Sequence, residues 1–387
     1  MPYVREINQI DELPDLRKEW TALLQQTPDG SVYHSCEWLE AYGRHFGQGM
    51  RFRVLVVGEP GHVEGILPLV VYPERTRVGR LRVLSYPLHD WGSFYGPIGP
   101  DPAGTLLAGL THIRCTRRNW DFIELRWCGA PGTDLRHTEA AMRSSGMQAY
   151  ATIWDRTAII DLRGDWATYF AGRNRALRNN FRRRQKRIAR YGELRFERYR
   201  PRGEAFGDAD PRWDLYEACE RLAGRSWQAS ARDGTTLSSE SIRPFLREVH
   251  ELAARLGAVD VNLLWLDNRL LAFAYNYHWQ GYVSGLRVGF EPEYAHEGVG
   301  SLLWTMSIRD SFDRGDRIYD MGAGSLECKR HYRTDELPIF RFGHYPPSAP
   351  RAQVLRLRRW TQGYFLGEDA ALALCQGSSL SRRPPSG

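Results

Sequence analysis

One stretch of this chain, residues 282–332, constrains the fold more than any other. A strand-like run, Tyr282–Val288, leads through a loop that contains Gly298-Val299-Gly300 into an apolar helical run, and a second short strand, Arg317–Met321, follows. The first N–H groups of a helix have no internal partner, and the helix dipole favours negative charge there. Glycine lets a ligand approach that backbone closely. The stretch therefore predicts an anion site at Ala295–Gly300, or, as the alternative, an ordinary strand–loop–helix unit.

The order of the predicted elements occurs twice. Residues 212–345 read as two helices, a hairpin, a strand, the glycine loop with its helix, a strand, a short helix and a strand, and residues 1–150 have a similar order. This mixture indicates an α/β (α+β) fold, and the repetition indicates a duplicated unit. We predict domains at 1–155 and 156–345. A C-terminal extension, 346–387, is expected to be partly disordered, because its end is rich in Ser, Pro and Arg.

Positive charge is concentrated in one predicted helix, Asp165–Tyr191. Between residues 173 and 190 it carries nine Arg and Lys residues and no acid. The whole chain has a net charge of +7, so the remaining residues sum to about −2. Like charges on one helix repel each other, which suggests an anionic ligand nearby. A phosphate-bearing substrate, acidic side chains of the same chain, RNA and an anionic membrane surface all remain open, with nucleic acid the less favoured.

Composition narrows the class of protein. Hydrophobic residues make up 42% of the chain, which supports a substantial core. The six cysteines are scattered without a CxxC pair, so neither a zinc site nor a disulfide framework is expected, and we predict no metal ligands. No run of 18 apolar residues and no signal peptide is present, so we predict a cytoplasmic protein without a transmembrane segment.

At this point the sequence resembles a known family. The motifs are RNRALRNNFRRRQKRIARYGEL, the pair Ser226-Trp227, LLAFAYNYHWQGYVSGLRVGFEPEYAHEGVGSLLW, and DMGAG followed by CKRHY. They are similar to the GNAT acyltransferase superfamily, specifically its CelD-type branch associated with polysaccharide biosynthesis, and to the tandem-GNAT Fem-type transferases. HSCEWLEAY and VLVVGEPGHVEGILPLVV extend the resemblance into the first half. It implies tandem GNAT-like domains, each a mixed twisted sheet flanked by helices, of which the first is degenerate.

The resemblance also implies a site for a co-substrate. The family holds the CoA pyrophosphate in a Gln/Arg-x-x-Gly-x-Gly/Ala loop, which Gly298 and Gly300 match, whereas Ala295 stands at the polar position. Acetyl-CoA or another acyl-CoA is therefore the implied co-substrate. Its expected contacts are Leu286, Arg287, Val288, Ala295, Gly298, Val299, Gly300 and Ser301. Backbone N–H groups of the preceding strand would stabilise the oxyanion.

The chemistry of acyl transfer indicates further candidates. A proton must leave the nucleophile, and another can assist the departing thiolate. Tyr332 and Asp320 are the catalytic candidates: the resemblance implies that Tyr332 is the general acid, and Asp320 is a polar group at a strand end. The candidates for acceptor binding are Asp90, Trp91, Trp227, Tyr275, Lys329 and Arg330. We expect backbone groups of the loop to bind the donor, and the basic helix to supply the electrostatics for the acceptor.

Three functions follow from this reading. The first is an acyl-CoA-dependent N- or O-acyltransferase that acts by direct transfer on a sugar, amino sugar or polysaccharide precursor. The second is a Fem-like transferase that uses aminoacyl-tRNA and binds RNA through the basic helix. A single helix in place of the long two-helix arm of Fem-type proteins disfavours it. The third is a non-catalytic GNAT scaffold that binds a partner through that helix.

Overall fold

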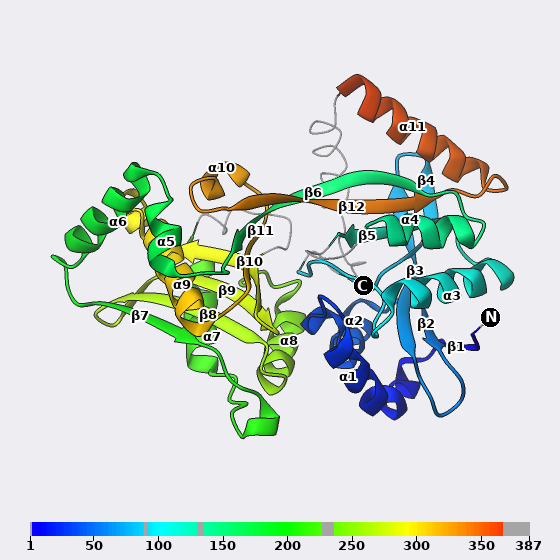
Figure 1. The fold of residues 1–387 in the computed structure, drawn as a ribbon, viewed down its shortest axis with the longest axis horizontal. Coiled ribbons are helices and arrows are strands. Elements are labelled where there is room, and N and C mark those ends of the chain that lie inside the picture. Colours follow the sequence, from blue (N-terminus) through cyan, green and yellow to red (C-terminus); the bar gives the residue numbers. More distant parts are fainter. Residues whose placement is uncertain (1, 89–90, 130–134, 227–235, 367–387) are drawn as a thin grey trace. The chain divides into compact units, whose positions relative to one another are not determined.

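The fold is that of a computed structural model, which describes residues 2–88, 91–129, 135–226 and 236–366. Contacts divide the chain into two units, Met1–Arg156 with Pro338–Gly387 (unit 1) and Thr157–Leu337 (unit 2). Each unit is a mixed sheet flanked by helices (Figure 1), which confirms the predicted fold class. In the described residues, no helix is long and apolar enough to cross a membrane.

Unit 1 begins with a strand and two helices that lead into a meander. Its elements are β1 (Val4–Ile7), α1 (Arg17–Gln26), α2 (Cys36–Phe46), β2 (Arg51–Val57), β3 (Gly65–Thr76), β4 (Gly79–Ser85), α3 (Pro102–Cys115), β5 (Phe122–Cys128), α4 (Leu135–Ser144), β6 (Tyr150–Asp161) and α11 (Pro350–Leu366). The strands β1 to β4 pair antiparallel in sequence order, and β4 pairs with β5 in parallel.

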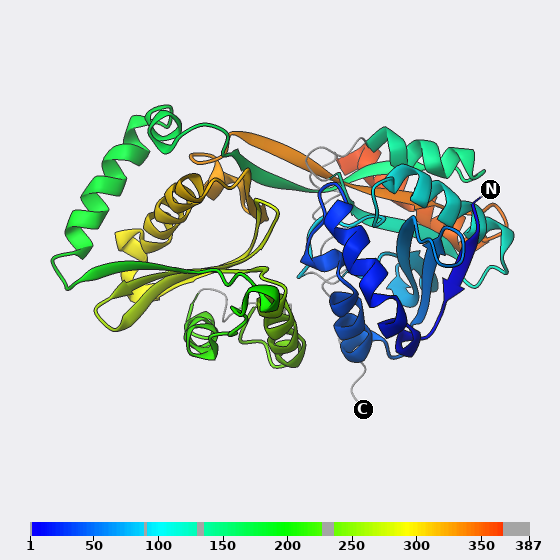
Figure 2. The same cartoon turned by 60° about the horizontal axis from the view of Figure 1, so that its bottom comes forward.

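Unit 2 repeats this order and ends within strand β12 (Asp335–His344), at Leu337. Its other elements are α5 (Trp166–Ala171), α6 (Arg175–Ile188), β7 (Leu194–Tyr199), α7 (Trp213–Ala223), α8 (Arg243–Arg255), β8 (Val259–Leu266), β9 (Arg269–Trp279), β10 (Tyr282–Phe290), the 3₁₀ helix η6 (Pro292–Glu297), α9 (Val299–Arg314), β11 (Ile318–Ala323) and α10 (Leu326–Lys329). Helix α9 covers one face of the β7–β10 strands, and α7 and α8 cover the other (Figure 2).

Both units have the same strand pattern, an antiparallel meander followed by one parallel pair. In unit 2 the parallel pair is β10 with β11, in the place that β4 and β5 occupy in unit 1. The last strands are exchanged: β11 pairs with the end of β6, and β5 pairs with β12. Because of this exchange, Pro338–His344 group with unit 1, whereas the sequence analysis places residues up to 345 in the second domain.

The prediction of a single helix over residues 165–191 is wrong, because the stretch forms two helices, α5 and α6. Asp165 caps α5 by accepting a hydrogen bond from the Thr168 N–H, and Gly172 ends it. Asn174 begins α6, since its Oδ1 accepts a hydrogen bond from the Leu177 N–H at 2.7 Å. A side-chain cap within the sequence thus starts a second helix.

A buried histidine ties α8 to the sheet of unit 2. His250 is 1% exposed, its Nδ1 lies 2.9 Å from the Tyr275 hydroxyl, and its Nε2 lies 2.6 Å from the Pro211 carbonyl oxygen. Burial lowers the pKa of His250 to about 4, below the value of 6.5 that an unfolded chain has. The folded state therefore binds fewer protons between these values.

We expect the free energy of unfolding to fall as the pH is lowered from about 6.5 towards 4, by roughly 2 kcal/mol at pH 5 for this one group. Urea unfolding at pH 7 and pH 5 measures the difference. His250→Asn should reduce the dependence of the free energy of unfolding on pH. Part of this dependence should remain, because burial also lowers the pKa of His34 to about 4. His62→Asn, at an exposed site, is the control. An unchanged slope in His250→Asn would contradict the assignment.

Candidate functional site

Strands β10 and β11 separate partway along their length. They pair in parallel only over Tyr282–Ser284 and Ile318–Asp320, although β10 continues to Phe290 beside β9. The register of β10 against β9 shifts between Gly285 and Arg287. A shift of this kind bends a strand and redirects its backbone groups. The result is a fork, defined here as Gly285–Val288 on β10 and Met321–Ala323 on β11.

Glycines allow the close approach at the base of the fork. A Cβ atom on Gly285 would lie 2.6 Å from the Asp320 carbonyl oxygen, and one on Gly322 would lie 2.5 Å from the Gly285 carbonyl oxygen. Gly322 also has a positive φ of 78°, which glycine adopts without strain. Neither position accepts a side chain without a shift of the backbone.

Asp320 lies at the base of the fork and is 1% exposed. Its carboxylate accepts hydrogen bonds from the Thr157 hydroxyl, from the Tyr282 hydroxyl at 2.9 Å and from the Gly322 N–H at 2.8 Å. Burial raises the pKa of Asp320, and these hydrogen bonds oppose that rise. Three donors on one buried carboxylate hold β6, β10 and β11 together, which is a positioning role.

Helix α9 packs against β10 and begins without a side-chain cap. Its N-cap is Gly298, with φ of 70°, whose N–H donates to the Ala295 carbonyl oxygen at 3.0 Å. The next bonded amide is that of Leu302, which donates to the Gly298 carbonyl oxygen. Three N–H groups, those of Val299, Gly300 and Ser301, therefore begin the helix without a cap among the described residues. The side chain of Ala295 is exposed and carries no polar group.

One arginine of α6 lies against this helix start. A Cβ atom on Gly298 would lie 2.5 Å from Cζ and Nε of Arg184, so the guanidinium packs on the glycine. Within the described chain Arg184 has no ion-pair partner, whereas Arg187, one turn further on, is paired with buried Glu297. Helix α6 packs against both η6 and α9 (Figure 2). Arg184 belongs to the basic helix whose charge we expected to serve the acceptor, but its guanidinium lies at the glycine loop.

Tyr332, which follows α10 in the sequence, contacts the first turn of α9. Its hydroxyl donates to the Ser301 carbonyl oxygen at 3.0 Å and lies 3.3 Å from the Thr305 hydroxyl. The ring is 3% exposed and packs against Trp304. Burial raises the pKa of Tyr332, and the positive charge of Arg184 acts in the opposite sense. The phenol therefore keeps its proton at neutral pH and can donate it.

The other predicted residues are placed differently. Lys329 is 6% exposed, and its Nζ donates to the carbonyl oxygens of Gly322 at 2.6 Å and Ala323 at 2.8 Å, so it secures one arm of the fork. Arg330 is half exposed and ion-paired with Glu327. Leu286, Arg287 and Val288 are half-buried and belong to the β10 arm of the fork.

Four predicted acceptor residues are either buried in other packing or lie outside the described residues. Tyr275 is buried beneath α7 and α8, where it contacts Tyr216 and His250. Trp91 is buried within unit 1. Asp90 and Trp227 lie outside the described residues.

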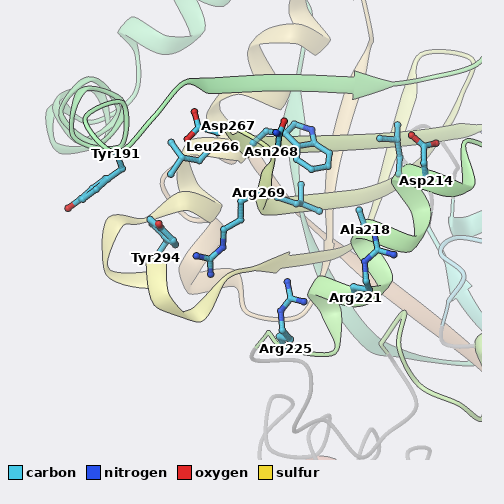
Figure 3. A pocket seen from close by; sticks show the side chains of 13 residues that line it. Tyr191, Asp214, Ala218, Arg221, Arg225, Leu266, Asp267, Asn268, Arg269 and Tyr294 are labelled. Carbon is cyan, nitrogen blue, oxygen red and sulfur yellow. The ribbon is translucent and has the colours of Figure 1, made fainter.

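A cavity of about 820 Å³ lies beside the β8–β9 turn in unit 2 (Figure 3). It is lined by Tyr191, Asp214, Leu215, Ala218, Arg221, Arg225, Trp265, Leu266, Asp267, Asn268, Arg269, Leu270 and Tyr294. Arg225 and Arg269 both donate to buried Glu291, at 2.6 and 3.2 Å. Arg221 is 63% exposed, and its ion-pair contact among the described residues is with Glu217 at 4.0 Å. An open cavity with aromatic rings and a weakly paired arginine suits an anionic polar ligand.

Sequence reasoning missed Arg184 as a site residue, although a signal for it exists. Leu177, Phe181 and Ile188 form the apolar stripe of α6, with a gap of seven between the last two. Arg184 occupies the helical position that fills this gap, so it must face inward with them. Thr157 and Tyr282 were also missed, because their contacts with Asp320 depend on strand pairing over long sequence separations.

Known proteins resemble this chain in sequence and in fold. The family model described as "Acetyltransferase (GNAT) domain" matches residues 175–330. Among solved structures, FemX superposes with a TM-score of 0.59 at 12% identity, over 91% of this chain and 99% of that one. The C-terminal domain of a putative lysylphosphatidylglycerol synthetase from Agrobacterium fabrum gives 0.54 at 13% identity, over 89% and 95%. At these identities the likeness shows the fold. A comparison with curated proteins gives no match.

Proposed function

We propose an acyl-CoA, such as acetyl-CoA, as the donor of this acyltransferase, whose residues 175–330 belong to the acetyltransferase (GNAT) family. The observation that carries the proposal is the fork between β10 and β11, together with the uncapped start of α9, a helix that packs against β10. The N–H groups of Val299, Gly300 and Ser301 are available for a pyrophosphate, and Arg184 adds a positive charge to the same helix start.

The residues present fit such a donor. Ala295 lacks the polar side chain that the resemblance implies, but Arg184 brings a guanidinium to the same turn from another helix. Arginine binds phosphate groups through several N–H donors at once, which an alanine cannot replace. We infer that Arg184 takes over the role of the missing anchor, so that the substitution at 295 leaves the donor site intact.

The chain supplies three groups for direct transfer. A backbone N–H group of Leu286–Val288 that faces the side of β10 from which β11 has separated is proposed to donate to the carbonyl oxygen as negative charge develops on it. The Tyr332 hydroxyl is proposed to give its proton to the departing thiolate, while the nucleophile releases its own proton to solvent, from which the tyrosinate is reprotonated. Asp320 is proposed to hold the two arms of the fork rather than to act as a base, since its carboxylate is buried and already accepts three hydrogen bonds.

Calorimetric titration with acetyl-CoA tests the donor, using Gly300→Glu and the matched variant Gly300→Gln. A Cβ atom at Gly300 would lie 3.4 Å from the Phe290 ring, an ordinary contact, so both variants should fold. We expect Gly300→Glu to weaken binding by about 100-fold, because its carboxylate repels the pyrophosphate, and Gly300→Gln to weaken it far less. No heat at millimolar acetyl-CoA with the unaltered protein would refute an acyl-CoA donor.

For the acceptor we propose a sugar, amino sugar or glycan precursor that carries negative charge, bound in the cytoplasm through the cavity beside the β8–β9 turn. The aromatic rings Tyr191 and Tyr294 and the weakly paired Arg221 support this choice. Tyr294 belongs to η6, which leads directly into the glycine loop, so the cavity and the donor site share an element.

Arg221→Ala should raise the Kd for glucosamine 6-phosphate about fivefold to tenfold while leaving the Kd for glucosamine unchanged, because only the phosphate meets the guanidinium. Arg309→Ala is a matched control. Arg309 has similar exposure, and its contact with Asp313 at 3.9 Å mirrors the 4.0 Å contact of Arg221 with Glu217, but it lies on α9. Equal losses in both variants, or no preference for the phosphate in the unaltered protein, would contradict this acceptor site.

Aminoacyl-tRNA is the second candidate donor, and the exposed arginines of α6 favour it. The exposed arginines are Arg175, Arg182, Arg183 and Arg190. If they bind RNA phosphates, the affinity for RNA should fall steeply as the salt concentration rises. RNA binding with that dependence, together with the absence of any acetyl-CoA effect, would favour this candidate over the first. The shared fold with FemX is compatible with either donor.

A further inference from the structure

Helix α11 of unit 1 is fixed to its sheet along one face. Ala352 is fully buried and Leu355 is 5% exposed. The Arg359 guanidinium donates to buried Glu124 and, at 2.7 Å, to the Tyr345 hydroxyl, and Arg356 donates to the Tyr150 hydroxyl at 2.8 Å. Two arginines and two apolar residues therefore anchor the inner face, and the helix keeps one orientation on the unit.

The opposite face of α11 is apolar and exposed. Val354, Leu357 and Trp360 are 55%, 55% and 64% exposed. A spacing of three residues places them in one stripe along the helix, pointing away from Ala352 and Leu355. Seven large hydrophobic side chains are exposed in the part of the chain that the structure describes, and three of them form this stripe. Clustered exposure of this kind marks an interaction surface, whereas single exposed residues do not.

Positive charge flanks the stripe. Arg351 and Arg358 are exposed and lie together on one side of it, a third of a turn or less from Val354. Residues 350–366 include four arginines and no Asp or Glu. Two of these arginines are used on the inner face, which leaves Arg351 and Arg358 for an outside partner.

We propose that the outer face of α11 binds the surface of a membrane that contains anionic lipid. An interfacial helix places its apolar residues, tryptophan included, at the boundary of headgroups and acyl chains, while its arginines meet lipid phosphates. The stripe supplies the first contact and Arg351 with Arg358 the second. Because the inner face is held by Glu124, Tyr150 and Tyr345, the helix binds without having to fold or reorient first.

A second copy of the chain suits this face less well. Two α11 helices packed through their stripes would bring Arg351 and Arg358 of both copies together. The segment has no acidic residue to pair with them. Like charges brought together at an interface oppose association, whereas an anionic lipid surface neutralises them.

Sedimentation of the full-length protein with vesicles tests the proposal. We expect binding to vesicles of 30% phosphatidylglycerol in phosphatidylcholine, and binding at least tenfold weaker to pure phosphatidylcholine or at high salt. Leu357→Ser with Trp360→Ser should lower the partition coefficient about tenfold or more, and Arg358→Glu should do the same, since each charge near the surface contributes about fivefold.

Two controls identify the surface that binds. Phe206→Ser removes an apolar side chain that is 63% exposed in unit 2, and it should leave binding unchanged. Arg182→Glu with Arg183→Glu reverses charge on α6, and α11 should still hold the vesicles. Loss of binding in the α6 variant with retention in the α11 variants would overturn the proposal. The proposal would also be overturned if the unaltered protein did not bind anionic vesicles. A further contradicting result would be a dimer in gel filtration that becomes a monomer in the double variant Leu357→Ser with Trp360→Ser.

Discussion

Arg184→Glu is expected to weaken acetyl-CoA binding by about 100-fold. The substitution removes a guanidinium that packs on Gly298 and places a carboxylate beside the pyrophosphate site. Loss of a charge-assisted hydrogen bond contributes about 1.5–3 kcal/mol, and repulsion between like charges adds to it. Calorimetry measures the change in Kd. Helix α6 should remain folded, because Leu177 and Ile188 still bury its apolar stripe.

Arg183→Glu is the matched control for this prediction. Arg183 is next to Arg184 on α6, and replacing it by Glu changes the net charge by the same amount. Its guanidinium, however, donates to Asn180 on the same helix and does not pack on Gly298. A general electrostatic effect of the basic helix would weaken binding equally in both variants. Equal losses would therefore show that Arg184 has no local role, and an unaffected Kd in Arg184→Glu would remove it from the donor site.

Tyr332→Phe is expected to lower kcat about 100-fold with little change in KM for acetyl-CoA. The variant removes a proton donor and one hydrogen bond to the Ser301 carbonyl oxygen, so its cost in stability is only about 1 kcal/mol. Burial raises the pKa of Tyr332, so the alkaline limb of the kcat profile should lie above the pH at which an ordinary tyrosine ionises. That limb should disappear in the variant.

Steady-state kinetics with Thr305→Val provide the comparison. This variant removes the hydroxyl 3.3 Å from Tyr332 but keeps the phenol and its contact with Ser301, so its kcat should stay near that of the unaltered protein. A thiol with a pKa near 8.5 can also leave without assistance. Retention of full kcat in Tyr332→Phe would show that the thiolate leaves in this way, and Tyr332 would then be structural.

Local sequence patterns predicted the elements of the site but not their contacts. The glycine loop and the helix after it follow from Gly298, Gly300 and an apolar run, all within a few residues of each other. The role of Tyr332 as a general acid was inferred only from family resemblance, and its position beside the first turn of α9 was not predicted. Its hydrogen bond to Ser301 spans 31 residues, a separation that no local periodicity encodes.

The parts that sequence reasoning did not predict depend on distant pairing. The exchange of β6 and β12 brings Thr157 to Asp320 across 163 residues, and nothing in either strand specifies the partner. The β10–β11 fork depends on backbone contacts at Gly285 and Gly322, of which the first lies in sequence within a predicted strand and the second within an ordinary glycine turn. Arg184 was recoverable, since its place in the apolar stripe of α6 indicates that it faces inward.

Amide hydrogen exchange of the full-length protein, with and without acetyl-CoA, tests the donor site most directly. The account predicts slower exchange at two places, the first turn of α9, residues 299–301, and the β10 arm of the fork, residues 286–288. The uncapped N–H groups of that turn exchange readily unless a ligand accepts from them. Protection elsewhere in the chain, with residues 299–301 unchanged at saturating acetyl-CoA, would contradict the account.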